Sequence, residues 1–213
     1  MRYRLHKPLL FALALGLFSL NTQASCPAVR SEGISCHEYA SPPKGSTWSD
    51  GELRVNFFFM YTSPHSGPLE KFTRDWHNKQ NFAVGMYHVS WGGSEFARTH
   101  YALVKHGLAG SLNQRLFDAI RSKTYRGQDD LVAWATAEGS ARAGLLKVAV
   151  DSQQAHDYAN LAERMAQLSE VDTVPAFTIS GKYRVTVLKT DPTTLSELEA
   201  LLDALVVRVW PAH

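Results

Sequence analysis

The sequence predicts an α/β fold in which two strand-and-helix halves form a small mixed sheet around an inserted helical block. Residues 55 to 60 are almost continuously apolar, as expected of a strand buried on both faces. Short strand patterns return at residues 176 to 179 and 183 to 187, and helical patterns fill the chain from about 94 to 168. Helices on both faces of such a sheet satisfy the layering and handedness rules of α/β folds.

The first 24 residues are expected to be a signal peptide that is not part of the fold. Arg2, Arg4 and Lys7 give it a positive start, residues 9 to 20 form an apolar run, and Ala24 offers a cleavage site. This run is shorter than the roughly 20 residues that span a membrane, so we expect no stable membrane insertion after cleavage. The sequence therefore predicts export to the periplasm.

The 189 residues that remain are enough for one core with an inserted subdomain. They carry 19 basic and 20 acidic side chains, a balance that favours no nucleic-acid partner. No internal repeat or low-complexity tract interrupts them.

Residues 25 to 52 form an N-terminal segment that contains both cysteines of the chain, Cys26 and Cys36. In an oxidising compartment such a pair is expected to form a disulfide that staples the segment locally. A redox-active pair is an alternative that the spacing does not favour, because it is far from Cys-x-x-Cys, and free or intermolecular thiols are a third possibility. Residues 41 to 46 then form a breaker-rich connector.

After the buried strand, Ser63 and Pro64 are expected to begin a helix, with the serine as N-cap and the proline in the first turn. That helix would run to about His77. Its inner face would carry apolar residues at spacings of three and four, namely Leu69, Phe72 and Trp76. A second strand is expected at residues 82 to 89.

The helical block is expected to break near residues 107 to 110, at Gly127 and near residues 139 to 144. The two late strands are separated by Ser180 and Gly181, a pair suited to a tight hairpin turn. A final amphipathic helix is marked by leucines on one stripe: Leu195, Leu198, Leu201, Leu202 and Leu205.

Three segments resemble the DsbA family of thiol:disulfide oxidoreductases, and they follow one another in that family's order. Residues 55 to 66, which end in Ser-Pro-His-Ser, are similar to the apolar strand and the Cys-Pro-His-Cys helix start of the family. Residues 171 to 177, followed by Gly-Lys-Tyr at 181 to 183, are similar to the stretch with the family's cis-proline and hairpin. Residues 86 to 93 resemble the strand and turn that lead into its helical domain.

The resemblance implies a thioredoxin fold with an inserted helical domain. The thioredoxin-like domain would comprise residues 53 to 93 and 171 to 207, and the helical subdomain would comprise residues 94 to 170. An open groove is then expected beside the start of the first helix.

By resemblance, Ser63 stands where the family has its nucleophilic cysteine, and Ser66 stands where it has the resolving one. His65 matches a histidine that helps to stabilise the thiolate. Glu70, expected to be half-buried and paired, matches an acid of the helix, and Asn56 stands where the family usually has a buried glutamate. Disulfide exchange needs a thiolate, which a serine hydroxyl cannot replace at neutral pH, so a redox-inactive site is expected. Serine hydrolysis is not favoured either, because no Gly-x-Ser-x-Gly surrounds either serine.

Pro175 matches the family's cis-proline, and by resemblance Thr173, Val174 and Pro175 would bind an extended polypeptide by strand addition. The alternative is that Pro175 only shapes the turn opposite the helix end. The first functional hypothesis is therefore a periplasmic, chaperone-like accessory factor. Its partners would be extended or unfolded exported polypeptides, and components of a secretion or envelope assembly system.

Two other functions remain open. One is a thiol:disulfide interchange protein that contributes to disulfide-bond formation through Cys26 and Cys36. The other is a purely structural subunit. No cofactor is expected, and the histidines His88, His100 and His106 do not form a metal-ligand pattern, so no metal site is expected either.

Overall fold

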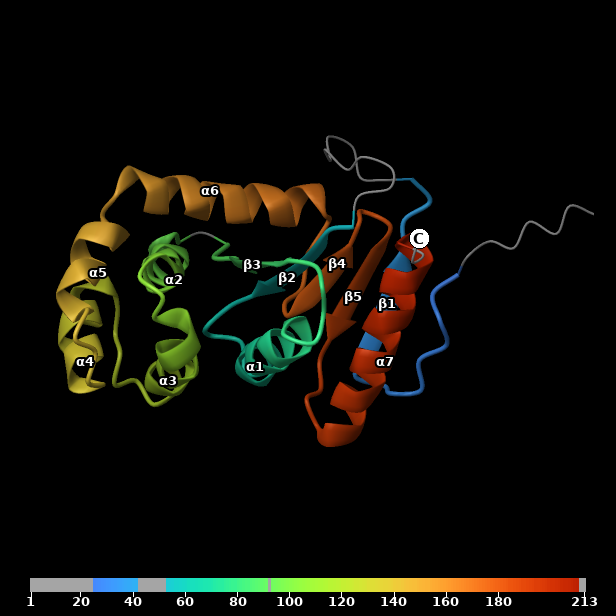
Figure 1. Cartoon of the computed structure of the whole chain (residues 1–213), viewed down its shortest axis with the longest axis horizontal. Coiled ribbons are helices and arrows are strands. Elements are labelled where there is room, and N and C mark those ends of the chain that lie inside the picture. The colour runs from blue at the N-terminus through green and yellow to red at the C-terminus, as the bar shows by residue number, and fades with distance from the viewer. Residues whose placement is uncertain (1–24, 42–52, 92, 211–213) are drawn as a thin grey trace, which may run out of the picture.

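The computed structural model describes residues 25 to 41, 53 to 91 and 93 to 210. The expected signal peptide and most of the breaker-rich connector lie outside these ranges. Within them, five strands form one mixed sheet in the order β1-β5-β4-β2-β3 (Figure 1). None of the described helices is long and apolar enough to cross a membrane.

The central part of the sheet is built around β2 (Val55–Phe59). This strand lies between β4 (Ala176–Ile179), which is antiparallel to it, and β3 (Val84–His88), which is parallel. All five residues of β2 are buried, as its apolar run predicts. The Phe57 ring lies 4.8 Å from the Phe177 ring of β4, so the strand is fixed in a dense aromatic core.

Helices cover both faces of the sheet. α1 (Ser66–His77) and α7 (Pro192–Val209) share one apolar core with alternate residues of β2. Phe58 points to the opposite face and packs in a smaller cluster with the C-terminal part of α6 (Gln153–Leu168). Figure 1 shows α6 along one side of the sheet, with α1 and α7 on the other.

The predicted helical block consists of several short helices that lie beside the sheet (Figure 1). They precede α6 in the order α2 (Glu95–Lys105), α3 (Ala109–Arg121), a 3-10 turn (Gln128–Asp130), α4 (Leu131–Ala137) and α5 (Ala143–Val150). The breaks fall where the sequence predicts them. Gly107 and Gly139 have φ values of 66° and 80°, which glycine adopts without the steric cost that other residues meet.

α6 ties the helical block to the sheet. The Tyr158 hydroxyl of α6 donates to the main-chain oxygen of Met86 at 2.9 Å. The Glu163 carboxylate of α6 accepts from the Ser90 N–H at 2.7 Å. Met86 lies on β3 and Ser90 follows it, so the helical block is held against the β3 edge of the sheet.

The sequence did not predict β1 (Ile34–Glu38), which forms one edge of the sheet antiparallel to β5 (Tyr183–Val187). Ile34 is its only buried residue, so the segment has no apolar alternation to mark it as a strand. Its partner strand lies near the other end of the chain, a pairing that no local pattern predicts.

Candidate functional site

The turn between β2 and α1 places the Ser-Pro-His-Ser segment at the start of the helix. The Ser63 N–H donates to the Met60 carbonyl at 3.1 Å, and the Ser66 N–H donates to the Ser63 carbonyl at 3.2 Å. α1 begins at Ser66, and His65 is its N-cap residue, without a side-chain capping bond. The prediction that Ser63 caps the helix is therefore wrong, because Ser63 belongs to the tight turn that precedes it.

The two serines differ in accessibility. Ser66 is fully buried, and its hydroxyl accepts from the Met60 N–H at 3.3 Å, which joins the end of β2 to the start of α1. Ser63 and His65 are half-buried, so both face solvent in part. In the part of the chain that the structure describes, no residue hydrogen-bonds to the Ser63 side chain. Ser63 is therefore the serine that a ligand can reach.

A buried acid supports α1 from below. Glu70 is fully buried, where the sequence predicted half-burial, and its carboxylate is paired as expected. It accepts from Asn113 at 2.9 Å and from Gln114 at 2.6 Å, both on α3, and Arg74 Nε lies 3.1 Å away. The α3 partners explain the deeper burial, because the helical block covers this side of α1. The carboxylate thereby joins α1 to α3.

Tyr61 extends this polar network towards β3 and α2. Its hydroxyl donates to the Asn113 side-chain oxygen and lies 3.1 Å from His100 Nδ1. Its N–H donates to His88 Nε2 at 3.0 Å. Tyr61, His88 and His100 are all buried, so their polar atoms satisfy one another inside the core.

Burial controls the ionisation of these groups. Desolvation lowers the pKa of the His100 imidazole to about 4. Desolvation, and then the neighbouring His100, lower the pKa of His88 well below its ordinary value. Desolvation, and then Glu70, raise the pKa of the Tyr61 phenol well above its ordinary value. The network is therefore held with neutral rings at neutral pH.

A cavity of about 330 Å³ lies between the first turn of α1 and α3. In Figure 1 the start of α1 is the end of that helix nearer to α3. The cavity is lined mainly by Ser63, Pro64 and Pro68 on the α1 side and by Gln114, Phe117 and Ile120 on the α3 side. Ser63 and α3 of the helical block therefore line the same cavity, and a groove was expected beside the start of α1.

The peptide bond before Pro175 is cis, as the resemblance implies. Ala176 pairs with Phe58, so residues 173 to 175 lie at the same end of the sheet as the turn that carries Ser63. Their side chains go from exposed to half-buried to buried, in the order Thr173, Val174 and Pro175. None of the three lines the cavity, so the predicted binding residues form two neighbouring groups at one end of the sheet.

No model of a known protein family matches the chain. The thiol:disulfide interchange protein DsbA of Bordetella pertussis is 27% identical over 180 residues, which cover 82% of this chain and 83% of that protein. The oxidoreductase DsbA of Xylella fastidiosa has a similar structure, with a TM-score of 0.66 and 20% identity over 86% of this chain and 98% of that one. The chain has a DsbA-like thioredoxin fold.

One DsbA structure is of particular interest. A cysteine-to-serine variant of the DsbA of Proteus mirabilis, solved with the non-covalently bound peptide PWATCDS, matches with a TM-score of 0.65 and 21% identity. The match covers 84% of this chain and all of that one.

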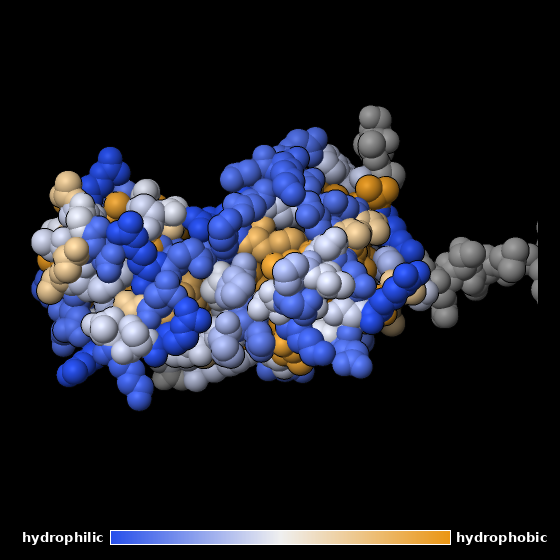
Figure 2. Space-filling view, turned by 90° about the horizontal axis from the view of Figure 1, so that it is seen from below, coloured by the Kyte–Doolittle hydropathy of each residue, from blue (hydrophilic) through white to orange (hydrophobic). Residues whose placement is uncertain are grey.

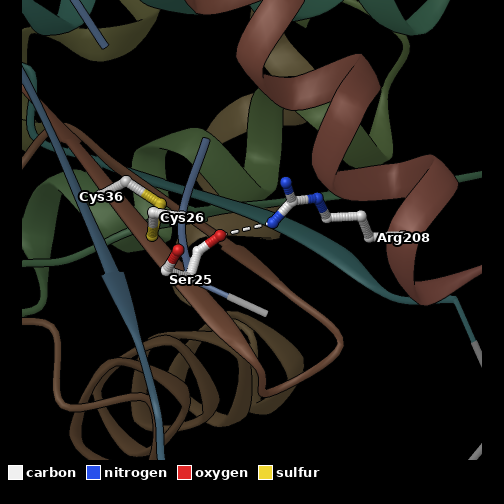
Figure 3. Close-up of a disulfide and its surroundings, with 4 residues drawn as sticks. All are labelled: Ser25, Cys26, Cys36 and Arg208. Atoms are coloured by element: carbon white, nitrogen blue, oxygen red, sulfur yellow. Dashed lines mark hydrogen bonds between the residues drawn. A yellow bond between two sulfur atoms is a disulfide. The ribbon is translucent and has the colours of Figure 1, made fainter. Parts of the chain in front are cut away.

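In this DsbA-like fold the cysteines lie away from the α1 turn. Cys26 and Cys36 form a disulfide, as the sequence predicts. Cys36 lies on β1, which is three strand positions from β2, or roughly 14 Å at the usual strand spacing. Figure 3 shows the disulfide beside α7, where Arg208 donates to the Ser25 main-chain oxygen. The disulfide therefore fastens the N-terminal segment to the far edge of the sheet.

Replacing Cys26 and Cys36 with alanine is expected to lower the free energy of unfolding by about 2–3 kcal/mol. The bond closes a loop with a sequence separation of 10 residues, and short loops of this size restrict the unfolded chain by about that amount. Urea denaturation of both proteins measures the difference. The unchanged protein in excess reductant serves as the control and should lose the same free energy of unfolding. Equal denaturation midpoints for the unchanged protein, the variant and the reduced protein would contradict the prediction.

Sequence reasoning missed the polar residues that support the site. Asn113 and Gln114 join α1 to the helical block but belong to no motif, and Tyr61 lies within residues 55 to 66 without having been singled out there. A signal for Asn113 exists, because it stands beside Leu112 and before Leu116 on the buried face of its helix. A polar residue at an inner helical position usually has a buried partner. No group of His, Cys, Asp and Glu suited to a metal ion occurs among the described residues.

Proposed function

We propose that this DsbA-like protein binds extended or unfolded exported polypeptides in the periplasm without exchanging disulfides at the α1 turn. The observation that carries the proposal is the pair Ser63 and Ser66 at the helix start, where the DsbA resemblance requires sulfur. A serine hydroxyl is hardly ionised at neutral pH and forms no mixed disulfide with a client. What remains of the site is a binding surface, suited to a chaperone-like accessory factor.

The Proteus mirabilis neighbour supports this proposal. Its cysteine-to-serine variant holds a peptide non-covalently, so the loss of a thiol in that protein is compatible with peptide binding. Ser63 of the present chain is likewise a partly exposed serine, and it precedes the start of α1.

The main chain before β4 offers the second support. Among the residues that the structure describes, none hydrogen-bonds to the main chain of Thr173 or Val174. The Pro175 carbonyl accepts from the Val187 N–H at 3.2 Å, so the bonding resumes only at Pro175. Free main-chain groups beside an ordered sheet are the requirement for strand addition by an extended polypeptide.

The Thr173→Trp variant is expected to bind unfolded polypeptide at least about tenfold more weakly, equivalent to about 1.4 kcal/mol, because the indole would cover the free main chain. The probe is reduced and carboxymethylated lactalbumin, which stays unfolded and has no thiol to exchange. Titration calorimetry measures the affinity. Thr136→Trp, at an exposed threonine of α4, is the matched control and should bind like the unchanged protein. Equal affinities in all three proteins, or no binding by any, would overturn the proposal.

Thiol:disulfide interchange through Cys26 and Cys36 is the second candidate. The disulfide itself and the names of the relatives favour it. Against it stand the half-buried sulfur positions at the far edge of the sheet and their spacing of ten residues. A pure protein that catalyses insulin reduction, and loses this activity when both cysteines become alanine, would establish this candidate instead.

A further inference from the structure

We infer that the cavity between α1 and α3 receives one large, uncharged apolar side chain of the bound polypeptide. This inference rests on the proposed function and assigns a ligand class to a part of the site that Thr173, Val174 and Pro175 do not line. The argument uses the size of the cavity, the chemistry of its walls and the charges around it.

The volume suits a side chain and not a folded segment. At about 330 Å³ the cavity is at the lower end of the range of about 300–1,000 Å³ found for small-molecule sites. An aromatic or branched aliphatic side chain fits in such a space, and a helix or hairpin does not.

The walls are largely apolar. Pro64 and Pro68 line the cavity on the α1 side, and Phe117 and Ile120 line it on the α3 side. At Gly67, which also lines the cavity, an added Cβ would lie 3.3 Å from the Phe117 ring. The absence of a side chain there lets α1 approach α3 closely and leaves the Phe117 ring as part of the wall. Such walls favour a ligand group that gains from leaving water.

The charges at the cavity are neutralised within the chain. Asp118 and Arg121 line the cavity and form an ion pair with each other. The side-chain nitrogen of Gln114 already donates hydrogen bonds to the Gly67 carbonyl at 2.8 Å and to the Glu70 carboxylate at 2.6 Å. A charged ligand group that enters between the apolar walls would lose hydration there without gaining an unpaired partner, which disfavours acidic and basic side chains.

Polar groups with spare hydrogen-bonding capacity stand at the rim instead. In the described part of the chain, the hydroxyls of Thr62 and Ser63 have no hydrogen-bond partner. A ligand that fits here has an apolar group between α1 and α3 and polar groups close by, within reach of these two hydroxyls. A polypeptide has this character at every large apolar residue. Figure 2, which views the molecule from the side on which α1 and α3 lie in Figure 1, shows hydrophilic residues and a hydrophobic patch near the middle of this face.

The test uses peptides of the form PXATSDS, in which X is tryptophan, leucine, alanine or glutamate and serine removes the thiol. Titration calorimetry with the unchanged protein is expected to give at least about tenfold tighter binding for tryptophan and leucine than for alanine and glutamate. The Ile120→Asp variant, which puts a charge in the wall, is expected to lose this preference while it still binds the alanine peptide. Ile120→Trp fills the cavity without adding a charge and should act in the same way.

Leu145→Asp, at an exposed leucine of α5, is the matched control and should keep the preference. Circular dichroism checks that each variant is folded, and the two Ile120 variants keep the test decisive if one of them is not. Peptides that bind with equal affinity whatever X is would overturn this inference and leave the proposed function standing. Failure of every peptide and of lactalbumin to bind the unchanged protein would overturn the proposed function itself. A preference that survives in both Ile120 variants would place the apolar subsite elsewhere and also overturn the inference.

Discussion

The Ser63→Cys, Ser66→Cys double variant is expected to catalyse the reduction of insulin by dithiothreitol, while the unchanged protein stays at the rate of the blank. The change restores Cys-Pro-His-Cys at the start of α1, where the partial positive charge of the helix end stabilises a thiolate. If the pKa of the first thiol falls from about 8.5 to about 7, about half of it is ionised at pH 7, compared with about 3% of a free cysteine. A serine oxygen offers no such nucleophile. Turbidity of precipitating insulin chains measures the rate.

Two controls make this result specific. The thiolate of the single Ser63→Cys variant should attack a disulfide probe such as oxidised glutathione, form a mixed disulfide and release one glutathione thiol. The variant should not turn over efficiently, because no second thiol resolves the mixed disulfide. The double variant on a background with Cys26 and Cys36 changed to alanine should remain active. Activity that depends on Cys26 and Cys36 would move the chemistry to the N-terminal segment. A folded double variant without activity would show that this turn cannot support sulfur chemistry.

Acidification is expected to destabilise the fold by about 3 kcal/mol through His100 alone. Its folded pKa is about 4, below the ordinary value of 6.5, so the unfolded chain binds more protons between these two values. Stability from this group is therefore complete above about pH 6.5, falls as the pH drops, and is lost below about pH 4. A shift of about 2.5 units corresponds to about 3 kcal/mol. His88 acts in the same direction, since its pKa is lowered too.

Urea denaturation at several pH values between 7 and 4.5 measures this effect. The decisive quantity is the slope of the unfolding free energy against pH. A variant that is less stable by the same amount at every pH has an unchanged slope. His100→Gln, which keeps a hydrogen-bonding group beside Tyr61, should have a clearly smaller slope. His106→Gln, at a less buried histidine, is the matched control and should keep the slope of the unchanged protein. Identical slopes in all three proteins would contradict the prediction.

Much of the fold could be predicted because its central elements carry local signals. The continuous apolar run of β2 and the hairpin through Ser180 and Gly181 each correspond to an observed element. The glycines of the helical block correspond to its breaks. β1 could not be predicted in this way, because a strand with one buried residue is held by its partner β5 and by the disulfide, and not by its own pattern.

The candidate site likewise has parts that could be predicted from local sequence and parts that could not. The motif at residues 63 to 66 follows a buried strand and Pro175 directly precedes one, so both could be located in the sequence, and the resemblance to the DsbA family implied the cis bond. The contacts of Glu70 with Asn113 could not, because they join positions more than 40 residues apart on different helices. The start of α1 also differed from expectation, since turns and helix ends use the same residue types and only the tertiary packing decides between them.

The bonds from α6 to the β3 edge also bear on the speed of association. The helical block cannot swing away from the sheet without breaking the Tyr158–Met86 and Glu163–Ser90 contacts, so the spacing of α1 and α3 is set in advance. A receptor that is already in its binding shape loses little conformational entropy when it is occupied. Encounter and orientation, and not a slow opening step, should then limit the rate at which a client docks.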